Sequence, residues 1–169
     1  MLVQESLAKE VVHMTSDALS KPTNPEQIET IESRYGPVQV NLKQAMFFPK
    51  GLIGMPEMAN FALANLPDKR MENFKLLQSL DDHRLSFVVL PLIPDGPLYD
   101  QKDIDECCQA LEIKRENLVL MAIVTVQRTA DKTRVTANIR APLVVDSEEK
   151  VAIQYVFPNN KYQITHALT

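Results

Sequence analysis

The chain has 169 residues, a length that fits one domain with a tail, and its 45% hydrophobic residues exclude a fully disordered chain. Lys and Arg number 18 against 22 Asp and Glu, so the formal net charge is -4. That balance disfavours a general polyanion binder, because counterion release needs clustered Lys and Arg, and it suits a basic partner instead.

The first part of the chain differs from the rest. Apolar residues recur in it at near-helical spacing until Pro22 and Pro25 stop any helix. We predict that residues 1–27 are an N-terminal extension, helical or partly ordered, which either docks on the body or offers an amphipathic face to a partner. Its charged residues interrupt any apolar core, so no signal peptide is expected.

From about residue 28 the pattern indicates short strands. Pro91 and Pro94 are expected to end the fifth of these strands or to mark it as an edge. The early strands are predicted around Gln39, Ala45–Phe48, Phe61–Leu63, Phe74–Leu77 and Leu85–Leu90.

One segment interrupts the β pattern. Asp103 is expected as the N-cap of a short helix running to Leu111, with Glu106 at capping-box spacing. This helix would pack over one end of the sheet with Cys108 as a small core residue. A reactive thiol at Cys107 or Cys108 is the other interpretation, although nothing basic follows closely enough to lower the thiol pKa.

The last third of the chain is predicted to be β again. Leu118–Val126 is almost continuously apolar and indicates a central strand covered on both sides. A turn at residues 129–132 should join it to the next strand. In that strand one face is expected to be buried, with Val135, Ala137 and Ile139, and the other solvent-exposed, with Arg134, Thr136, Asn138 and Arg140. Further strands are expected at Lys150–Phe157 and, after an Asn-rich turn, at Tyr162–Ile164.

These elements predict a mainly β fold: a compact antiparallel β-barrel or sandwich of about nine short strands with one or two short helices. The two cysteines are adjacent and have no other partner in the chain, which favours a reducing compartment. No apolar run approaches the roughly 20 residues of a membrane span. We therefore expect a cytoplasmic protein that does not bind a membrane.

The search for catalytic chemistry gives little. The three histidines lie far apart, and no nucleophile elbow, Walker or dinucleotide pattern is present, so no catalytic residue, metal or cofactor is expected. Gly51 and Gly54 form a GxxG loop like that of nucleic-acid-binding KH domains, but prolines flank it and turn formation explains the glycines first. Asp81 and Asp82 fit a solvated turn after a strand. The acidic run at residues 146–149 is either a hairpin loop or a contact surface for a basic partner.

Four segments form a recognisable series along the chain. They are Arg34–Val38, the Phe48–Met55 element similar to F-P-x-G-L-x-G-F, the Leu77–Asp82 element close to L-Q-S-L-D-D, and Ala122–Val126 with Thr136–Val145, similar to an I-V-T-V strand and an N-L-x-A-P strand pair. Taken in order, these segments resemble the FliW family of flagellar assembly factors. The resemblance covers roughly residues 33–165 and implies a FliW-like β-barrel domain over residues 28–169.

The resemblance also implies a function. Family members are non-enzymatic regulators that bind cytoplasmic flagellin and the RNA-binding translational repressor CsrA. Flagellin that accumulates occupies the factor and frees CsrA to repress flagellin translation, and export of flagellin reverses the exchange. The motifs nominate the partner-binding residues Phe48, Gly51, Gly54, Leu80, Asp81, Asp82 and Asn138.

Several of these residues also have structural explanations. Phe48 alternates with Met46 and fits a core position, and the two glycines fit a requirement of the backbone. Two rival functions remain at this level. A small β-barrel that binds an unidentified ligand, or hydrolyses one, predicts a concave pocket with shifted pKa values. Direct nucleic-acid binding through the GxxG loop predicts a steeply salt-dependent affinity, which the acidic balance disfavours.

Overall fold

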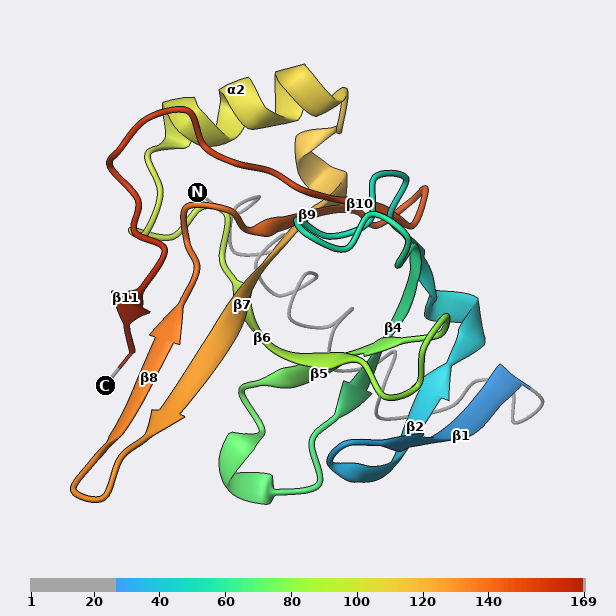
Figure 1. Cartoon of the computed structure of the whole chain (residues 1–169). Helices are drawn as coiled ribbons and strands as arrows, with labels where there is room; N and C mark the ends of the chain where they lie inside the picture. The colour runs from blue at the N-terminus through green and yellow to red at the C-terminus, as the bar shows by residue number, and fades with distance from the viewer. Residues whose placement is uncertain (1–26, 169) are drawn as a thin grey trace.

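The computed structural model describes residues 27–168 of the chain, and the predicted N-terminal helix lies outside the described residues. Figure 1 shows that most of the regular structure in this part is β, with α2 (Gln101–Leu111) as its α-helix. Short 3-10 helices lie at Leu42–Gln44, Lys69–Met71 and Arg115–Asn117. The strands are β1 (Ile28–Ser33), β2 (Gly36–Asn41), β3 (Met46–Phe47), β4 (Asn60–Asn65), β5 (Lys75–Ser79), β6 (Ser86–Leu92), β7 (Leu118–Arg128), β8 (Thr133–Ala137), β9 (Leu143–Asp146), β10 (Val151–Gln154) and β11 (His166–Ala167).

Seven strands close into a ring. Following the hydrogen-bonded neighbours from β7 through β6, β5, β4, β3, β10 and β9 leads back to β7. All of these neighbours are antiparallel except β10 and β3, which meet in parallel at a single pair, Val151 and Phe47. The ring confirms the prediction of a mainly β, barrel-like fold. The five early strands are found where the sequence placed them, and β1 was not among the predicted strands.

The interior of the ring is one apolar cluster. Because side chains alternate across a strand, every ring strand turns one row of residues inward. Phe48 and Phe61 are fully buried there, with ring centroids 5.1 Å apart in an edge-to-face arrangement. The other buried members are Met46, Leu52, Leu77, Val89, Val119, Met121, Leu143, Val145 and Ala152.

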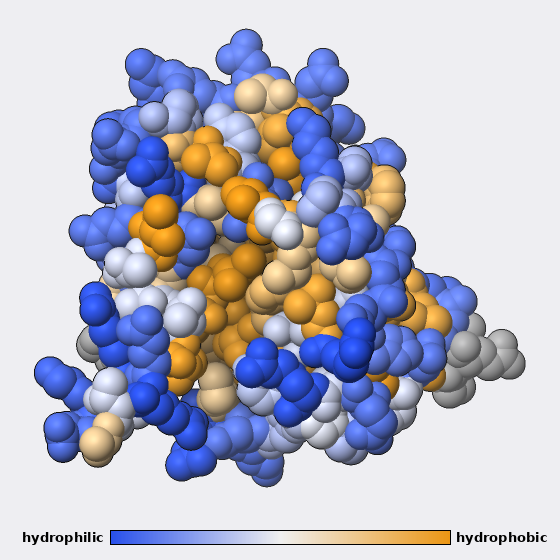
Figure 2. All heavy atoms as spheres, in the orientation of Figure 1, coloured by the Kyte–Doolittle hydropathy of each residue, from blue (hydrophilic) through white to orange (hydrophobic). Residues whose placement is uncertain are grey.

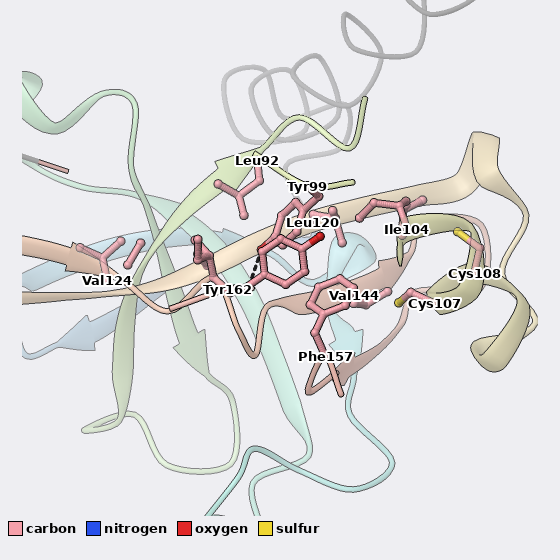
Figure 3. Packing of buried hydrophobic residues seen from close by; sticks show 14 of the residues in the cluster. Leu92, Tyr99, Ile104, Cys107, Cys108, Leu120, Val124, Val144, Phe157 and Tyr162 are labelled. Atoms are coloured by element: carbon pink, nitrogen blue, oxygen red, sulfur yellow. Dashed lines mark hydrogen bonds between the residues drawn. The ribbon is translucent and has the colours of Figure 1, made fainter. Parts of the chain in front are cut away.

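Two layers cover parts of the outer surface of the ring. The β1–β2 hairpin lies over β4 and β5, where Ile31, Val38 and Val40 pack on Ala62, Ala64 and Leu76. On the other side, α2 and the C-terminal segment cover the outer face of β6, β7 and β9. Figure 3 shows Ile104, Cys107 and Cys108 of α2 gathered with Phe157 and Tyr162 around Leu120 and Val144. The helix was predicted in this place, with Cys108 in the core, and both predictions are confirmed.

The prediction that Asp103 caps this helix was wrong. The N-cap is Asp100, and Asp103 lies buried in the first turn. There its carboxylate accepts a hydrogen bond of 2.5 Å from the Tyr162 hydroxyl and pairs with Lys161. The predicted strand at Tyr162–Ile164 is also absent, because the Tyr162 ring packs against Tyr99 and Phe157 instead of lying along a ladder. The last strand, β11, begins four residues later and pairs with β8.

The long strand β7 matches its prediction only in its first half. Leu118–Ala122 is buried and lies between β6 and β9, but Thr125 and Val126 are exposed, because no layer formed by residues 27–168 covers the end of the β7–β8 hairpin. The turn at residues 129–132 is confirmed by the backbone bond from Thr129 to Lys132. Strand β10 stops at Gln154, short of the predicted Phe157.

Two further expectations need correction. Strand β8 ends at Ala137, so Asn138 is a half-buried residue beyond the strand rather than a wet-face residue, and Thr136 is buried. Strand β6 runs through Pro91, which pairs only with β7 because β5 ends its pairing at Val89. A proline at such a local edge breaks no ladder bond.

Candidate functional site

The outer face of β3 and β10 lies between the two covering layers. Met46 and Ala152 point into the ring, so their neighbours Phe47, Val151 and Ile153 point outward. Phe47 is 48% exposed, and Val151 and Ile153 are half-buried. We refer to Phe47, Val151 and Ile153 as the β3–β10 surface. Contiguous exposed apolar side chains of this kind mark contact sites for other proteins.

The loop after β3 borders this surface and contains the first family motif. The N–H of Phe48 donates to the oxygen of Ala59, and Leu52 and Met55 exchange two backbone hydrogen bonds, so the loop closes on itself. Phe48 turns into the ring and cannot reach a partner in this conformation. Two other apolar side chains of this segment, Phe47 and Ile53, are exposed instead. Ile53 is 62% exposed.

The two glycines of this loop have different roles. Gly51 has φ +60°, and a Cβ there would lie 2.3 Å from the carbonyl oxygen of Met55. Gly54 has φ +85°, but nothing lies within 4 Å of the position of a Cβ. Both positions favour glycine because the left-handed region penalises a side chain, and Gly51 also permits the close approach of the backbone. The turn explanation of the glycines therefore accounts for both positions.

The second motif loop is joined to the first by Asp81. Its Oδ2 accepts hydrogen bonds of 2.7 Å from the N–H groups of Ala59 and Asn60, and its Oδ1 accepts one of 2.9 Å from the Asn60 side chain. The bond from the Asn60 amide, together with the two backbone bonds, holds the pKa of Asp81 below its usual value. Asp81 is therefore an exposed carboxylate fixed in position, not a freely solvated turn residue.

Asp82 and Leu80 complete this loop. The carboxylate of Asp82 forms a two-point pair with Arg84, at 3.0 Å and 2.9 Å, and these bonds lower its pKa. Ser79 Oγ accepts the N–H groups of both Asp81 and Asp82, which sets the turn. Leu80 is half-buried and packs against the cluster beneath the β1–β2 hairpin.

A chain of hydrogen bonds brings Asn138 into the same region. Asn138 Oδ1 accepts from the N–H of Ala141, the carbonyl of Ala141 accepts from Gln154 Nε2, and Gln154 Oε1 accepts from the N–H of Ile53 at 2.9 Å. The last of these three hydrogen bonds joins Ile53 and Gln154, which lie 101 residues apart in the sequence. Asn138 thus acts on the first motif loop through Ala141 and Gln154, and it is a positioning residue in this arrangement.

Asp81 ties the second motif loop to the start of β4, and Asn138 is linked to the first motif loop through Ala141 and Gln154, whereas Leu80 packs beneath the β1–β2 hairpin. Phe47, Ile53 and Gln154 were not among the nominated residues. Phe47 could have been found from its strand alternation with the core residue Phe48. The exposure of Ile53 and the Gln154 bond depend on tertiary contacts that no local pattern shows.

The acidic run between β9 and β10 is largely structural. Asp146 Oδ1 accepts the N–H groups of Glu148 and Glu149, and Glu148 accepts a hydrogen bond of 2.6 Å from Asn117. Among residues 27–168 no group of three or more His, Cys, Asp or Glu side chains could hold a metal ion. The same part of the chain has no helix long and apolar enough to cross a membrane.

Comparison with known proteins places these features in a family. A family model described as FliW protein matches residues 29–168. The flagellar assembly factor FliW of Anoxybacillus flavithermus is 32% identical over 140 residues, which cover 82% of this chain and 93% of that protein. FliW of Clostridium botulinum (strain Alaska E43 / Type E3) is 29% identical over 134 residues, or 79% of this chain and 93% of that protein. A crystal structure of the flagellar assembly factor FliW superposes with a TM-score of 0.65 at 28% identity, covering 83% of this chain and 97% of that one.

Proposed function

This chain belongs to the FliW family of flagellar assembly factors, and from that membership we propose that it works by exchanging two protein partners. It binds cytoplasmic flagellin and the translational repressor CsrA, one at a time. Flagellin that accumulates occupies the factor and leaves CsrA free to repress flagellin translation. When flagellin is exported, the factor binds CsrA and relieves that repression. This role is regulatory and requires no catalytic group.

The observation that carries the proposal is the position of Phe47. Its aromatic ring is half-exposed on the sector of the ring that neither covering layer reaches, beside the two loops that hold the family motifs. Large aromatic side chains at the centre of an interface contribute most of its binding free energy. The half-buried side chains of Val151 and Ile153 and the exposed side chain of Ile53 extend the same surface.

Charge supports the choice of partner. The chain carries a formal net charge of -4, and Asp81 presents a fixed carboxylate at the border of the β3–β10 surface. An RNA-binding protein such as CsrA needs cationic groups for its phosphate contacts. Opposite charge speeds the encounter of two proteins and disfavours wrong partners more than it raises affinity.

The test is calorimetric titration of the full chain with purified CsrA and, separately, with flagellin from the same organism. We expect both to bind, and excess flagellin to displace CsrA. Phe47→Ser should weaken binding by about 30-fold, the effect of losing roughly 2 kcal/mol at an interface centre. Ile93→Ser is the matched control, because Ile93 is 50% exposed but lies after β6, outside this surface.

The outcomes separate the parts of the proposal. Binding of neither partner by the folded protein would overturn it. Binding of flagellin alone would leave a chaperone-like role without translational control. Equal losses in the Phe47 and Ile93 variants would show that the β3–β10 surface is not the contact site.

A further inference from the structure

A second feature lies on the far end of β7, where this strand separates from β6. The two strands pair from Leu92–Leu120 to Val89–Ile123 and then part. Beyond that point β6 pairs only with β5, and β7 pairs only with β8. In the described part of the chain, the side of β7 that faces β6 therefore has no strand partner from Val124 to Arg128.

The direction of the backbone groups follows from two backbone hydrogen bonds of the hairpin. Ile123 accepts through its carbonyl from Asn138, and Thr129 donates to Lys132, so the odd-numbered residues of this stretch turn their backbone groups toward β8. Successive residues in a strand turn to opposite sides. The N–H and C=O groups of Val124, Val126 and Arg128 consequently point to the open side, which makes this stretch an unpaired strand edge.

The side chains beside this edge are apolar. Val124 lies opposite Ala137 and Val126 opposite Val135, so these four share one face of the hairpin. Val124 and Ala137 are buried in the cluster under α2, whereas Val126 is 39% exposed. The apolar face thus continues beyond the part of the sheet that is covered. Figure 2 shows apolar side chains across this face of the molecule, with hydrophilic residues at the projecting hairpin tip.

The charge of the hairpin end is opposite to that of the whole chain. Arg128, Lys132 and Arg134 are exposed, and Asp131 is the acidic residue of the turn. No ion pair between described residues involves any of the three cations. Figure 1 shows the hairpin reaching out beyond the rest of the molecule, so among the residues of its tip the three cations outnumber the one carboxylate, Asp131. An acidic protein therefore carries a basic, unpaired strand edge.

We propose that the open edge of β7 binds an extended acidic segment of another protein, which pairs with Val124, Val126 and Arg128 as an added strand. Main-chain hydrogen bonds supply affinity in this mode of recognition, and side chains supply specificity. Here alternate apolar residues of the segment contact Val126 and Val135, and the carboxylates between them lie on the opposite face, where they pair with Arg134 and Lys132. A second copy of this chain is disfavoured, because it offers the same cationic edge. This site is separate from the β3–β10 surface.

The probe is a synthetic peptide of about seven residues, near the usual length of a strand, in which glutamate alternates with valine. A matched peptide carries lysine in place of glutamate. The full chain, labelled with ¹⁵N, is titrated with each peptide and followed by NMR. We expect the acidic peptide to bind, to shift the Val124, Val126 and Arg128 amides and to slow their hydrogen exchange. The affinity should fall as salt screens the charges.

Proline substitution tests whether the N–H group of Val126 points to the open side of β7. Val126→Pro removes an N–H that faces the open side and leaves the β8 ladder intact, so the fold should survive while peptide affinity falls about tenfold or more. Val126→Ala keeps that N–H and controls for the lost side chain. Lys132→Glu with Arg134→Glu gives an independent test, because it should reverse the preference to the lysine peptide.

Three results would overturn the proposal. The first is that the acidic peptide leaves the spectrum of the folded chain unchanged. The second is that the lysine peptide binds the unaltered chain equally well, and the third is that a folded Val126→Pro variant keeps full affinity. If Val126→Pro fails to fold, the charge-reversal variant and the exchange rates of the three amides still decide the question.

Discussion

Asp81 and Asn60 are joined by two hydrogen bonds, one from the Asn60 backbone N–H to Oδ2 at 2.7 Å and one from its side-chain amide to Oδ1 at 2.9 Å. They lie 21 residues apart: Asn60 begins β4 directly after the first motif loop, and Asp81 lies in the second motif loop. One carboxylate therefore fixes the relative position of both loops. Substitution of Asp81 changes the shape of the site as well as its charge.

Loss of this carboxylate should destabilise the protein. Asp81→Ala leaves the N–H groups of Ala59 and Asn60 without their acceptor. We expect the free energy of unfolding to fall by about 1–2 kcal/mol. This is the lower part of the usual cost of an unsatisfied hydrogen-bonding group, because water reaches the site. Asp82→Ala is the control, since its pair with Arg84 is local to the turn. Urea denaturation followed by circular dichroism measures both. Equal effects of the two substitutions would contradict the bridging role of Asp81.

The two glycines of the first loop should differ in tolerance. Gly54→Ala meets only the penalty of the left-handed backbone region, about 1 kcal/mol. Gly51→Ala adds a collision of its Cβ with the Met55 carbonyl at 2.3 Å, so its cost should reach about 2 kcal/mol or more. The melting temperatures of the two variants test this order. A smaller loss in Gly51→Ala than in Gly54→Ala would show that the loop rearranges freely.

The pair formed by Asp103 and Tyr162 predicts a pH-dependent effect. The hydrogen bond from the Tyr162 hydroxyl, with the nearby Lys161 ammonium, holds the pKa of Asp103 below its usual value. A carboxyl with a lowered folded-state pKa stabilises the fold fully above the unfolded pKa of about 3.9, and this stabilisation is lost as the pH falls further. Tyr162→Phe removes the main cause of the shift.

The Tyr162→Phe variant should therefore be less stable than the unaltered chain by about 1–3 kcal/mol near neutral pH. The difference should shrink below about pH 4, where the unaltered chain loses the same contribution. Denaturation curves at several pH values measure it. A difference that stays constant between neutral and acid pH would mean that the hydrogen bond from the Asp100 N–H to the Tyr162 hydroxyl, and not the bond to Asp103, explains the loss.

The adjacent cysteines should react slowly in the native state. Burial raises the pKa of Cys107 to about 12, with a further contribution from Cys108, and burial also raises the pKa of the Cys108 thiol despite the nearby Arg115. Thiolate is the reactive form, so both groups are protonated and shielded near neutral pH. We expect slow labelling by a thiol-specific reagent in buffer and rapid labelling in urea. Rapid native labelling of either thiol would support the reactive-thiol interpretation.

The parts of the fold that the sequence predicts are those governed by local pattern. The apolar run from Leu118, the turn at residues 129–132 and the apolar face of α2 are each visible within a few neighbouring residues. The errors arise where a residue far away in the sequence takes a contact that the local pattern assigns to a neighbour. Asp103 has the right spacing for an N-cap, but Tyr162 and Lys161, almost 60 residues later, take its carboxylate. The Tyr162 ring is buried by that contact, which prevents the predicted final strand.

The site could be predicted only as a set of segments. The motifs locate both loops, yet the roles of their residues depend on contacts between segments, such as Asp81 with Asn60 and Ile53 with Gln154. Phe48 and Asn138 were nominated as partner-binding residues, but Phe48 is buried in the core and the Asn138 side chain accepts a hydrogen bond from the Ala141 N–H. The exposed Phe47 lies one position away from a fully buried residue, because a strand turns neighbouring side chains to opposite faces.

The single parallel pair between Val151 and Phe47 has a consequence for the order of folding. The ring cannot close until β10 reaches β3, about 100 residues earlier in the chain, and the polar link from Gln154 to Ile53 forms at the same join. The cost in chain entropy of such a distant contact is met before the contact adds stability, so closure is expected late and slow. During synthesis, the edges of β3 and β9 stay open until residues 151–154 have been made. An arrested or truncated chain would expose these edges to pairing with other chains, and cells therefore gain from completing this protein quickly.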